Sequence, residues 1–440
     1  MKPQEMNFYV KELFKIAGPI IMGNLGFILL GVGDVIVAGR HSTQTFAAIS
    51  IAAAIVNCVM TLGMGLTSAI SPLLSNYRGQ NIPIKRYFYP SIRFALFWAL
   101  VSGLLILAII PTIPLIGFEK PLVEIIQQYM FISALSTFGG GLHQSLKEFL
   151  QAFEIVMFPN LLTIFCVFLN LGLNIIFVFG WGIIPSMGAI GLALATFFVR
   201  YFMGFALLIY CLCIMKLHNY HEKGYYKNLT KIGLPISMAI LTEFVAFNSI
   251  AIIMGRISGI YAAAQNLLCT FINTTFMVPF AISNAIAVKV GFANGANNMR
   301  DLKRYSCIGT GMSLTFMVFG ALTFILFPKF IVSIFTSDVQ LYNIVFPVVV
   351  ILSVYQIFDG MQISLSGICK GIKQTKIVLI SNFIAYWCIS IPLGCYLGLA
   401  QNMKLCGFWI GLLSASATLC VIMLLQLKMY FAKRRKLQEI

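Results

Sequence analysis

The sequence has 440 residues, of which 60% are hydrophobic and only 10% are charged. Soluble domains are about 45–50% apolar and about 25% charged, so this composition argues strongly against a soluble enzyme. The 30 basic and 13 acidic residues give a net charge of +17. In a soluble protein this excess would suggest a nucleic-acid partner, but the low total charge favours membrane topology instead. We therefore expect an integral protein of the lipid bilayer that binds no nucleic acid.

Twelve apolar stretches are each long enough for a transmembrane helix, which needs about 20 residues. They cover residues 13–38, 46–75, 88–117, 122–150, 159–180, 188–215, 229–254, 261–292, 302–335, 341–369, 375–398 and 404–430. Their length and the absence of strand-like alternation favour helices over a barrel. The first stretch continues too far for a cleavable signal peptide. The predicted fold class is an all-α membrane protein with twelve transmembrane helices.

The basic residues predict the orientation of these helices. Of the 30, 24 lie at the termini or near the loops that follow even-numbered stretches. Arg200 lies within a stretch, and the opposite side holds Arg40, Lys120, Arg256, Lys329 and Lys404. Because cytoplasmic loops of membrane proteins are enriched in Lys and Arg, we expect both termini in the cytoplasm and a multi-pass protein of the cytoplasmic (inner) membrane.

The two halves of the chain resemble each other at an offset of about 216 residues. The pairs are Leu13-Phe14-Lys15-Ile16-Ala17-Gly18-Pro19-Ile20 with Leu229-Thr230-Lys231-Ile232-Gly233-Leu234-Pro235-Ile236, and Ala38-Gly39-Arg40 with Met254-Gly255-Arg256. Six helices per half make this a parallel repeat about an axis along the membrane normal. We therefore expect an N-lobe at 1–218 and a C-lobe at 219–440, two pseudo-symmetric bundles around a central cleft. Such repeats favour a transporter that works by alternating access.

Three carboxylates lie deep within apolar stretches, namely Asp34, Glu243 and Asp359, whereas the other ten acids lie at stretch ends, in loops or in the termini. A carboxylate near the bilayer centre costs about 2.5–3.5 kcal/mol on insertion scales, so such a residue indicates a functional site. Protonated carboxylic acids that hydrogen-bond between helices are the structural alternative.

Polar neighbours suggest what these acids do. Tyr355 precedes Asp359 by one helical turn, and Asn170 and Asn174 share one face of the fifth stretch. Such oxygens suit a hard cation such as Na⁺, but the acids can equally bind a proton, and Asn pairs also join membrane helices. Arg200 either pairs with a carboxylate of its own half or extends toward the interface.

Several motifs together resemble the multidrug and toxic compound extrusion (MATE) family, nearly from end to end. They are Gly31-x-Gly33-Asp34-x-x-x-Ala38-Gly39-Arg40, Asn170-x-x-x-Asn174, Tyr355-x-x-x-Asp359, Cys369-Lys370-Gly371-x-x-Gln374-Thr375 and Tyr386-Trp387-x-x-x-x-Pro392. Acids in both halves are a mark of the NorM-like branch, whose members are typically Na⁺-coupled. The resemblance implies a C-lobe cation site at Glu243, Asp359 and Tyr355, with Na⁺ possible at the two acids. It also implies an N-lobe cation or substrate site at Asp34, Asn170, Asn174 and Thr196. Several relatives have an acid where this chain has the neutral Asn174, which leaves Na⁺ and H⁺ both open for this lobe.

These features predict a secondary multidrug antiporter and not an enzyme. It would export amphipathic, often cationic, organic compounds in exchange for Na⁺ or H⁺, function as a monomer, and need no cofactor beyond the coupling ion. A flippase of lipid-linked saccharides with the same fold is the alternative, but it would be expected to carry several basic residues in its cleft. A prenyl transferase would need Asp-rich Mg²⁺ motifs, and no DDxxD or DxxxD is present. A structural membrane scaffold would leave the three intramembrane acids unexplained.

Overall fold

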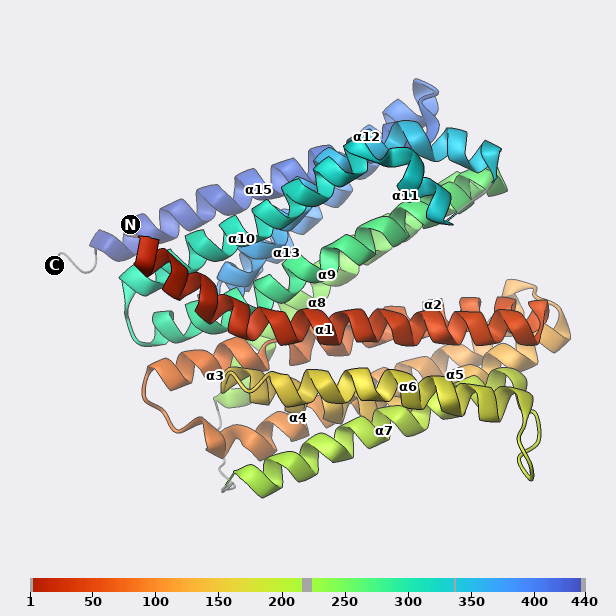
Figure 1. Ribbon diagram of the computed structural model, residues 1–440, viewed down its shortest axis with the longest axis horizontal. Helices are drawn as coiled ribbons and strands as arrows, with labels where there is room; N and C mark the ends of the chain where they lie inside the picture. Colours follow the sequence, from red (N-terminus) through yellow and green to blue (C-terminus); the bar gives the residue numbers. More distant parts are fainter. Residues whose placement is uncertain (1–2, 216–223, 336–337, 437–440) are drawn as a thin grey trace. The chain divides into compact units, whose positions relative to one another are not determined.

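A computed structural model describes residues 3–215, 224–335 and 338–436, and these residues are almost entirely helical. The long helices are α1 (Pro3–His41), α2 (Thr43–Thr67), α4 (Phe88–Ile109), α5 (Lys120–Ala152), α6 (Met157–Phe179), α7 (Gly188–Ile214), α8 (Tyr225–Ile257), α9 (Gly259–Gly295), α10 (Met299–Leu326), α12 (Val339–Gly371) and α15 (Lys404–Lys436) (Figure 1). The shorter ones are α3 (Ile70–Gly79), η1 (Ile84–Tyr87), η2 (Ile110–Ile116), α11 (Pro328–Phe335), α13 (Thr375–Phe383), η3 (Ile384–Ser390), α14 (Ile391–Cys395) and η4 (Tyr396–Ala400). An isolated bridge between Trp181 and Ile184 is the one extended pairing in the described part of the chain. The predicted all-α class is confirmed.

Eleven helical segments of the described residues are long and apolar enough to cross a membrane. Eleven of the twelve predicted stretches correspond to them. The remaining stretch, 122–150, forms α5, which is as long as the others but carries more polar side chains. Large apolar side chains also stay exposed on many helices, for example Phe97, Phe168, Phe319 and Leu326. So much exposed apolar surface fits a protein surrounded by lipid.

The predicted stretches and the helices differ in detail. The helix α1 begins ten residues before the predicted start at 13, and a break at Ser68 and Ala69 separates α2 from α3. The predicted helix at 375–398 is divided into α13, η3, α14 and η4, of which η3 and η4 are π-helical. Pro392 explains part of this division, because proline cannot donate the backbone hydrogen bond that a regular helix needs. The preceding residue, Ile391, donates its N–H to Tyr386 five residues back.

Helix boundaries repeat between the two halves at the offset that the sequence predicts. The helices α1 and α8 end at His41 and Ile257, and the helices that follow them begin at Thr43 and Gly259. Both pairs are 216 residues apart. The internal repeat is therefore present in the helix boundaries as well as in the amino-acid sequence.

The chain forms two compact units whose boundaries fall inside helices. The first, here the N unit, is Gly18–Ser237, and the second, here the C unit, combines Met1–Ala17 with Met238–Ile440. The predicted boundary between lobes at 218/219 lies outside the described residues, so this boundary stays a prediction, as does the central cleft. The N unit includes the first part of α8, which it holds tightly: a Cβ atom at Gly233 would lie 2.6 Å from the Leu66 carbonyl oxygen. Glycine is needed there for the close approach of α8 to α2.

Helix α12 occupies the interior of the C unit, where it packs against α9, α10 and α15. The largest fully buried side chains of this unit are Trp409, Tyr355, Tyr386 and Phe408. Two of them, Tyr355 and Tyr386, carry hydroxyl groups that need partners when buried. The interior of the C unit is therefore polar at the place where the sequence predicts a cation site.

Candidate functional site

Asp359 lies in the buried interior of the C unit, on α12. Tyr355 precedes it by one turn, so that helix geometry puts both side chains on one face. The Tyr355 hydroxyl donates a hydrogen bond of 3.4 Å to Asp359 Oδ1. Both residues are only 1% exposed. A carboxylate held by a single long hydrogen bond at such depth retains unused oxygen lone pairs.

Glu243 on α8 lies close enough to Asp359 for the two carboxylates to repel each other. The structure thus brings together Glu243, Asp359 and Tyr355, the three residues predicted for the C-lobe site.

Tyr386 is a fourth member of this cluster, which sequence reasoning did not assign to the site. Its hydroxyl donates a hydrogen bond of 2.9 Å to Glu243 Oε1 and receives one of 3.5 Å from Gln362 Nε2. Two further hydrogen bonds hold its segment along α8: Asn382 donates to the Ala239 carbonyl at 3.2 Å, and Trp387 to the Thr242 carbonyl at 3.4 Å. The Tyr386-Trp387 pair belongs to one of the motifs that resemble the family, and this motif is the sequence signal that could have pointed to Tyr386.

Trp409 packs against Tyr355, and Gln265 in turn holds Trp409. The Trp409 ring meets the Tyr355 ring edge-on at 5.7 Å between centroids, and its indole N–H donates to Gln265 Oε1 at 3.0 Å. Trp409 and Gln265 are both fully buried. Because Trp409 has its own hydrogen-bond partner, its ring has a fixed position against which Tyr355 is oriented.

Two acids and two phenolic hydroxyls therefore converge inside the C unit. The described residues contain no group of three His, Cys, Asp or Glu side chains that could hold a metal. A hard monovalent cation, however, also takes hydroxyl, amide and carbonyl oxygens. Because adjacent carboxylates repel each other, the arrangement favours uptake of either a proton or such a cation.

The residues predicted for the N-lobe site also lie together. Asn174 Nδ2 donates to Asp34 Oδ1 at 2.6 Å and to Asn170 Oδ1 at 3.0 Å. The Thr196 hydroxyl is buried beside Asp34. Helices α1, α6 and α7 supply these four residues, and all four belong to the N unit.

Arg200 joins the same cluster. It lies one turn after Thr196 on α7, and its Nη1 donates to Ser136 Oγ at 2.7 Å and to Met60 Sδ at 3.3 Å. Both hydrogen bonds stay within the N unit and neither goes to a carboxylate, so the two sequence-based alternatives for Arg200 stay predictions.

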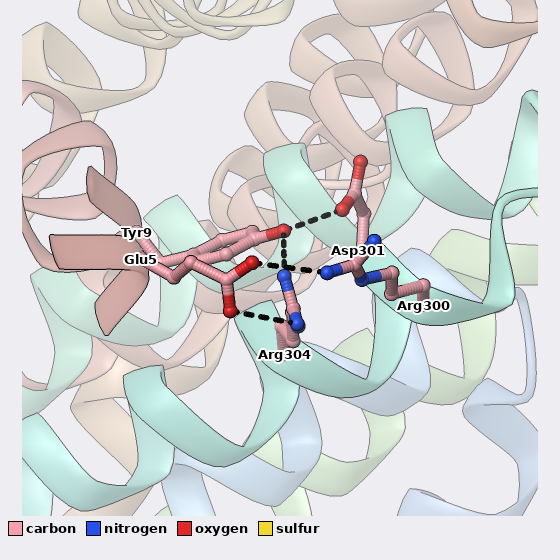
Figure 2. A network of polar contacts seen from close by, with 5 residues as sticks. All are labelled: Glu5, Tyr9, Arg300, Asp301 and Arg304. Carbon is pink, nitrogen blue, oxygen red and sulfur yellow. Dashed lines mark hydrogen bonds and ion pairs between the residues drawn. The ribbon is translucent and has the colours of Figure 1, made fainter. Parts of the chain in front are cut away.

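A separate polar cluster ties the start of α1 to the start of α10 within the C unit (Figure 2). Arg300 and Arg304 donate to the two oxygens of Glu5 at 3.0 and 3.1 Å. The Tyr9 hydroxyl donates to Asp301 Oδ1 at 2.6 Å and receives a bond from Arg304 at 3.2 Å. Five residues with balanced charges satisfy one another here, so we assign this cluster a structural role.

The long apolar helices and the enclosed carboxylates define the chain as a multi-pass membrane transporter. A family model, MatE, matches residues 19–176 and 235–396. The chain belongs to this family, the multidrug and toxic compound extrusion transporters. This membership also confirms that the protein is not an enzyme.

Individual relatives agree with this assignment. The chain is 25% identical over 430 residues to the probable multidrug resistance protein NorM of Bacillus subtilis (strain 168), covering 93% of each chain. It is also 25% identical to the NorM protein of Acinetobacter baylyi, covering 96% of each. Among solved structures, a mutant of the Vibrio cholerae MATE transporter VcmN gives a TM-score of 0.90 at 17% identity, covering 98% of both chains. The eukaryotic MATE transporter AtDTX14 gives 0.88 at 19% identity, covering 99% of both. The chain is thus a NorM-like member, and the structural matches establish its fold.

Proposed function

We propose that the protein is a multidrug efflux antiporter that exports amphipathic, often cationic, organic compounds in exchange for Na⁺ or H⁺. Multidrug resistance is the activity named for its NorM relatives. The observation that carries the exchange mechanism is the cluster of Glu243, Asp359, Tyr355 and Tyr386 inside the C unit. We propose that these four residues bind the coupling ion, with Na⁺ possible at Glu243 and Asp359.

The cluster gives a physical reason for two states. Without a bound cation, the two carboxylates repel each other and favour a looser arrangement of α8 and α12. Binding of Na⁺ or H⁺ removes this repulsion and favours closer packing. A ligand shifts such an equilibrium only by its differential affinity for the two states, and a cation between two acids supplies that difference.

The membrane gradient provides enough free energy for transport. One charge that moves down a potential of 100 mV releases about 2.3 kcal/mol. Exchange of an inward ion for an outward drug therefore allows efflux against a concentration gradient. The flippase alternative has no comparable observation in its favour and is not proposed.

We further propose that the protein functions as a monomer in the cytoplasmic membrane, with both termini in the cytoplasm. The 24-to-5 distribution of basic residues supports this orientation. A C-terminal green fluorescent protein fusion should then fluoresce and a C-terminal alkaline phosphatase fusion should be inactive. The reverse pattern would show that the orientation is wrong.

Ethidium efflux from proteoliposomes tests the proposed exchange. A Na⁺ gradient and a pH gradient are imposed separately, in the direction that drives ion uptake. We expect one of them to accelerate efflux by wild-type protein. Efflux that persists at the same rate when both gradients are collapsed would rule out antiport.

A further inference from the structure

The N unit contains a counterpart of the C-unit cluster. Helices α5 and α12 are both 33 residues long, and both their starts and their ends lie 219 residues apart. Gly141 and Gly360 share one position in this register. Gly141 packs closely against α4 and Gly360 against α10, which are the third long helices of their halves. The helix ends and an internal contact therefore agree on which residues of α5 and α12 correspond.

The charges at corresponding positions of the two units are opposite. Gly140 of α5 takes the position of Asp359 of α12 in this register, so the N unit has no acid there. Helices α7 and α15 begin 216 residues apart, which places Arg200 where the C unit has Ser416, a serine buried beside Tyr355. The N unit therefore carries a positive charge at the place where the C unit carries a negative one.

Arg200 has N–H groups that remain available for a ligand. Its two hydrogen bonds, to Ser136 Oγ at 2.7 Å and to Met60 Sδ at 3.3 Å, both leave from Nη1. A guanidinium has five N–H groups, and a thioether is a weak acceptor. Within the described residues neither bond goes to a carboxylate, and Asp34 accepts from Asn174 instead. Because buried charges are normally paired, this guanidinium is suited to bind an anion.

His143 supplies a second donor on the same face of α5. Ser136, Gly140 and His143 are four and three residues apart, a spacing that puts them on one side of a helix. Arg200 crosses this side, since its Cδ lies 3.7 Å from the position of a Cβ atom at Gly140. The His143 side chain is only 7% exposed, and its Nε2 has no hydrogen-bond partner among the described residues. A buried nitrogen of this kind costs free energy that a bound ligand would recover.

A ligand can reach this face. Gly140 and Arg200 are half-buried, so part of their surface stays open. Lys147, two turns after Gly140 on the same side of α5, is also half-buried and adds positive charge. The adjoining acid, Glu148, offsets part of this charge, but it is buried and accepts a hydrogen bond of 3.2 Å from Gln144.

We propose that Arg200 and His143 form a site in the N unit for a carboxylate group of the exported compound. This proposal rests on the antiport proposed above and names one class of its substrates: zwitterionic amphipathic compounds that carry a carboxylate as well as an organic cation. The planar guanidinium matches the two oxygens of a carboxylate, and the imidazole N–H donates a further bond. The two units thus bind groups of opposite charge, a cation in the C unit and a carboxylate in the N unit.

Binding of two related dyes to the purified protein tests the site. Rhodamine B carries a carboxylate, whereas its ethyl ester has the same rings without that charge. Fluorescence polarisation measures the Kd of each dye. In Arg200→Gln we expect the Kd of rhodamine B to rise about tenfold, because a charge-assisted pair is lost, and the Kd of the ester to change less than about twofold.

Further variants separate a binding role from a structural one. His143→Leu leaves Arg200 in place and should raise the Kd of rhodamine B about threefold, again without an effect on the ester. Arg200→Lys keeps the charge but not the planar fork, so its Kd should lie between those of wild type and Arg200→Gln. Arg93→Gln removes an exposed charge of the same unit and should change neither Kd. Equal changes for both dyes, or an unchanged Kd of rhodamine B, would overturn the proposal.

Competition on the wild-type protein identifies the anion and decides the question if Arg200→Gln does not fold. Benzoate should displace rhodamine B, and the uncharged benzamide should not. Equal displacement by benzamide would show that the contact is only apolar and would overturn the proposal. Displacement by phenyl phosphate but not by benzoate would assign the site to a phosphate group and overturn the carboxylate assignment.

Efflux from proteoliposomes distinguishes failure of this proposal from failure of the proposed function. Gradient-driven efflux of both dyes by wild type, with selective loss of rhodamine B efflux in Arg200→Gln, supports both. Wild-type protein that exports the ester but not rhodamine B would overturn the carboxylate as part of the cargo. If no gradient drives efflux of either dye, the proposed antiport fails, and the dye-binding measurements still decide whether the N unit binds a carboxylate.

Discussion

Tyr386 donates a hydrogen bond of 2.9 Å to Glu243, a residue 143 positions earlier in the chain. The bond joins a π-helical segment, η3, to the middle of α8. It fixes one oxygen of Glu243 and leaves the other available. The phenol therefore orients the carboxylate that we assign to ion binding.

Removal of this hydroxyl should weaken ion binding without abolishing transport. In Tyr386→Phe we expect about a tenfold rise in the ion concentration for half-maximal efflux, because a hydrogen bond to a charged group is worth about 1.5–3 kcal/mol. Tyr396→Phe is the matched control, since the Tyr396 hydroxyl meets only the exposed Gln401 side chain among the hydrogen bonds described for it. An unchanged half-saturating concentration in Tyr386→Phe would show that Tyr386 does not orient Glu243.

Substitutions of Asp359 and Tyr355 should reduce gradient-driven efflux to different extents. Asp359→Asn removes a charge from the proposed site, so we expect gradient-driven efflux to fall to background. Tyr355→Phe removes only a 3.4 Å hydrogen bond, so efflux should continue at a lower ion affinity. Asp338→Asn is the control on the same helix, because Asp338 caps α12 at an exposed position. If Asp359→Asn transports as fast as this control, Asp359 is not a coupling residue.

Substitution of Gln265 should mainly lower the thermal stability of the protein. In Gln265→Leu the buried indole N–H of Trp409 loses its acceptor, and an unsatisfied buried donor costs about 1–3 kcal/mol. The melting temperature of the purified protein should fall by several degrees. Gln401→Leu removes an exposed hydrogen bond and should leave it nearly unchanged. Equal melting temperatures for the two variants would contradict a supporting role for Gln265.

The α1–α10 cluster of Figure 2 should stabilise the protein in a salt-dependent way. Glu5→Gln removes the negative charge that Arg300 and Arg304 both contact, and it replaces one of the two acceptor oxygens with an NH2 group. Its melting temperature should lie below that of wild type in low salt and approach it in high salt, because salt screens exposed charges. Glu124→Gln, outside this cluster, serves as the control. A difference from wild type that is equal at both salt concentrations would argue against an electrostatic origin.

The sequence was sufficient to predict the class of fold and the main groups of the candidate site. Long apolar stretches determine membrane helices, and the free-energy cost of an intramembrane carboxylate makes Asp34, Glu243 and Asp359 conspicuous. Tyr355 and Asn170–Asn174 could be placed because spacings of one helical turn are local.

Contacts between distant segments could not be predicted in this way. The role of Tyr386 depends on η3, whose π-helical pairing precedes Pro392, and on a partner in α8. The unit boundaries inside α1 and α8 likewise depend on tertiary packing, such as the approach of Gly233 to Leu66. The placement of Arg200 required the positions of Ser136 and Met60, which no local pattern reveals.

The most direct test of the central claim is gradient-driven ethidium efflux by the Glu243→Gln/Asp359→Asn double variant in proteoliposomes, beside wild type. The coupling ion is the one whose gradient accelerates the wild-type protein. We predict that the double variant, if it elutes as a folded monomer, gives the same slow efflux with and without that gradient. Acceleration equal to that of wild type would contradict ion coupling at the C unit.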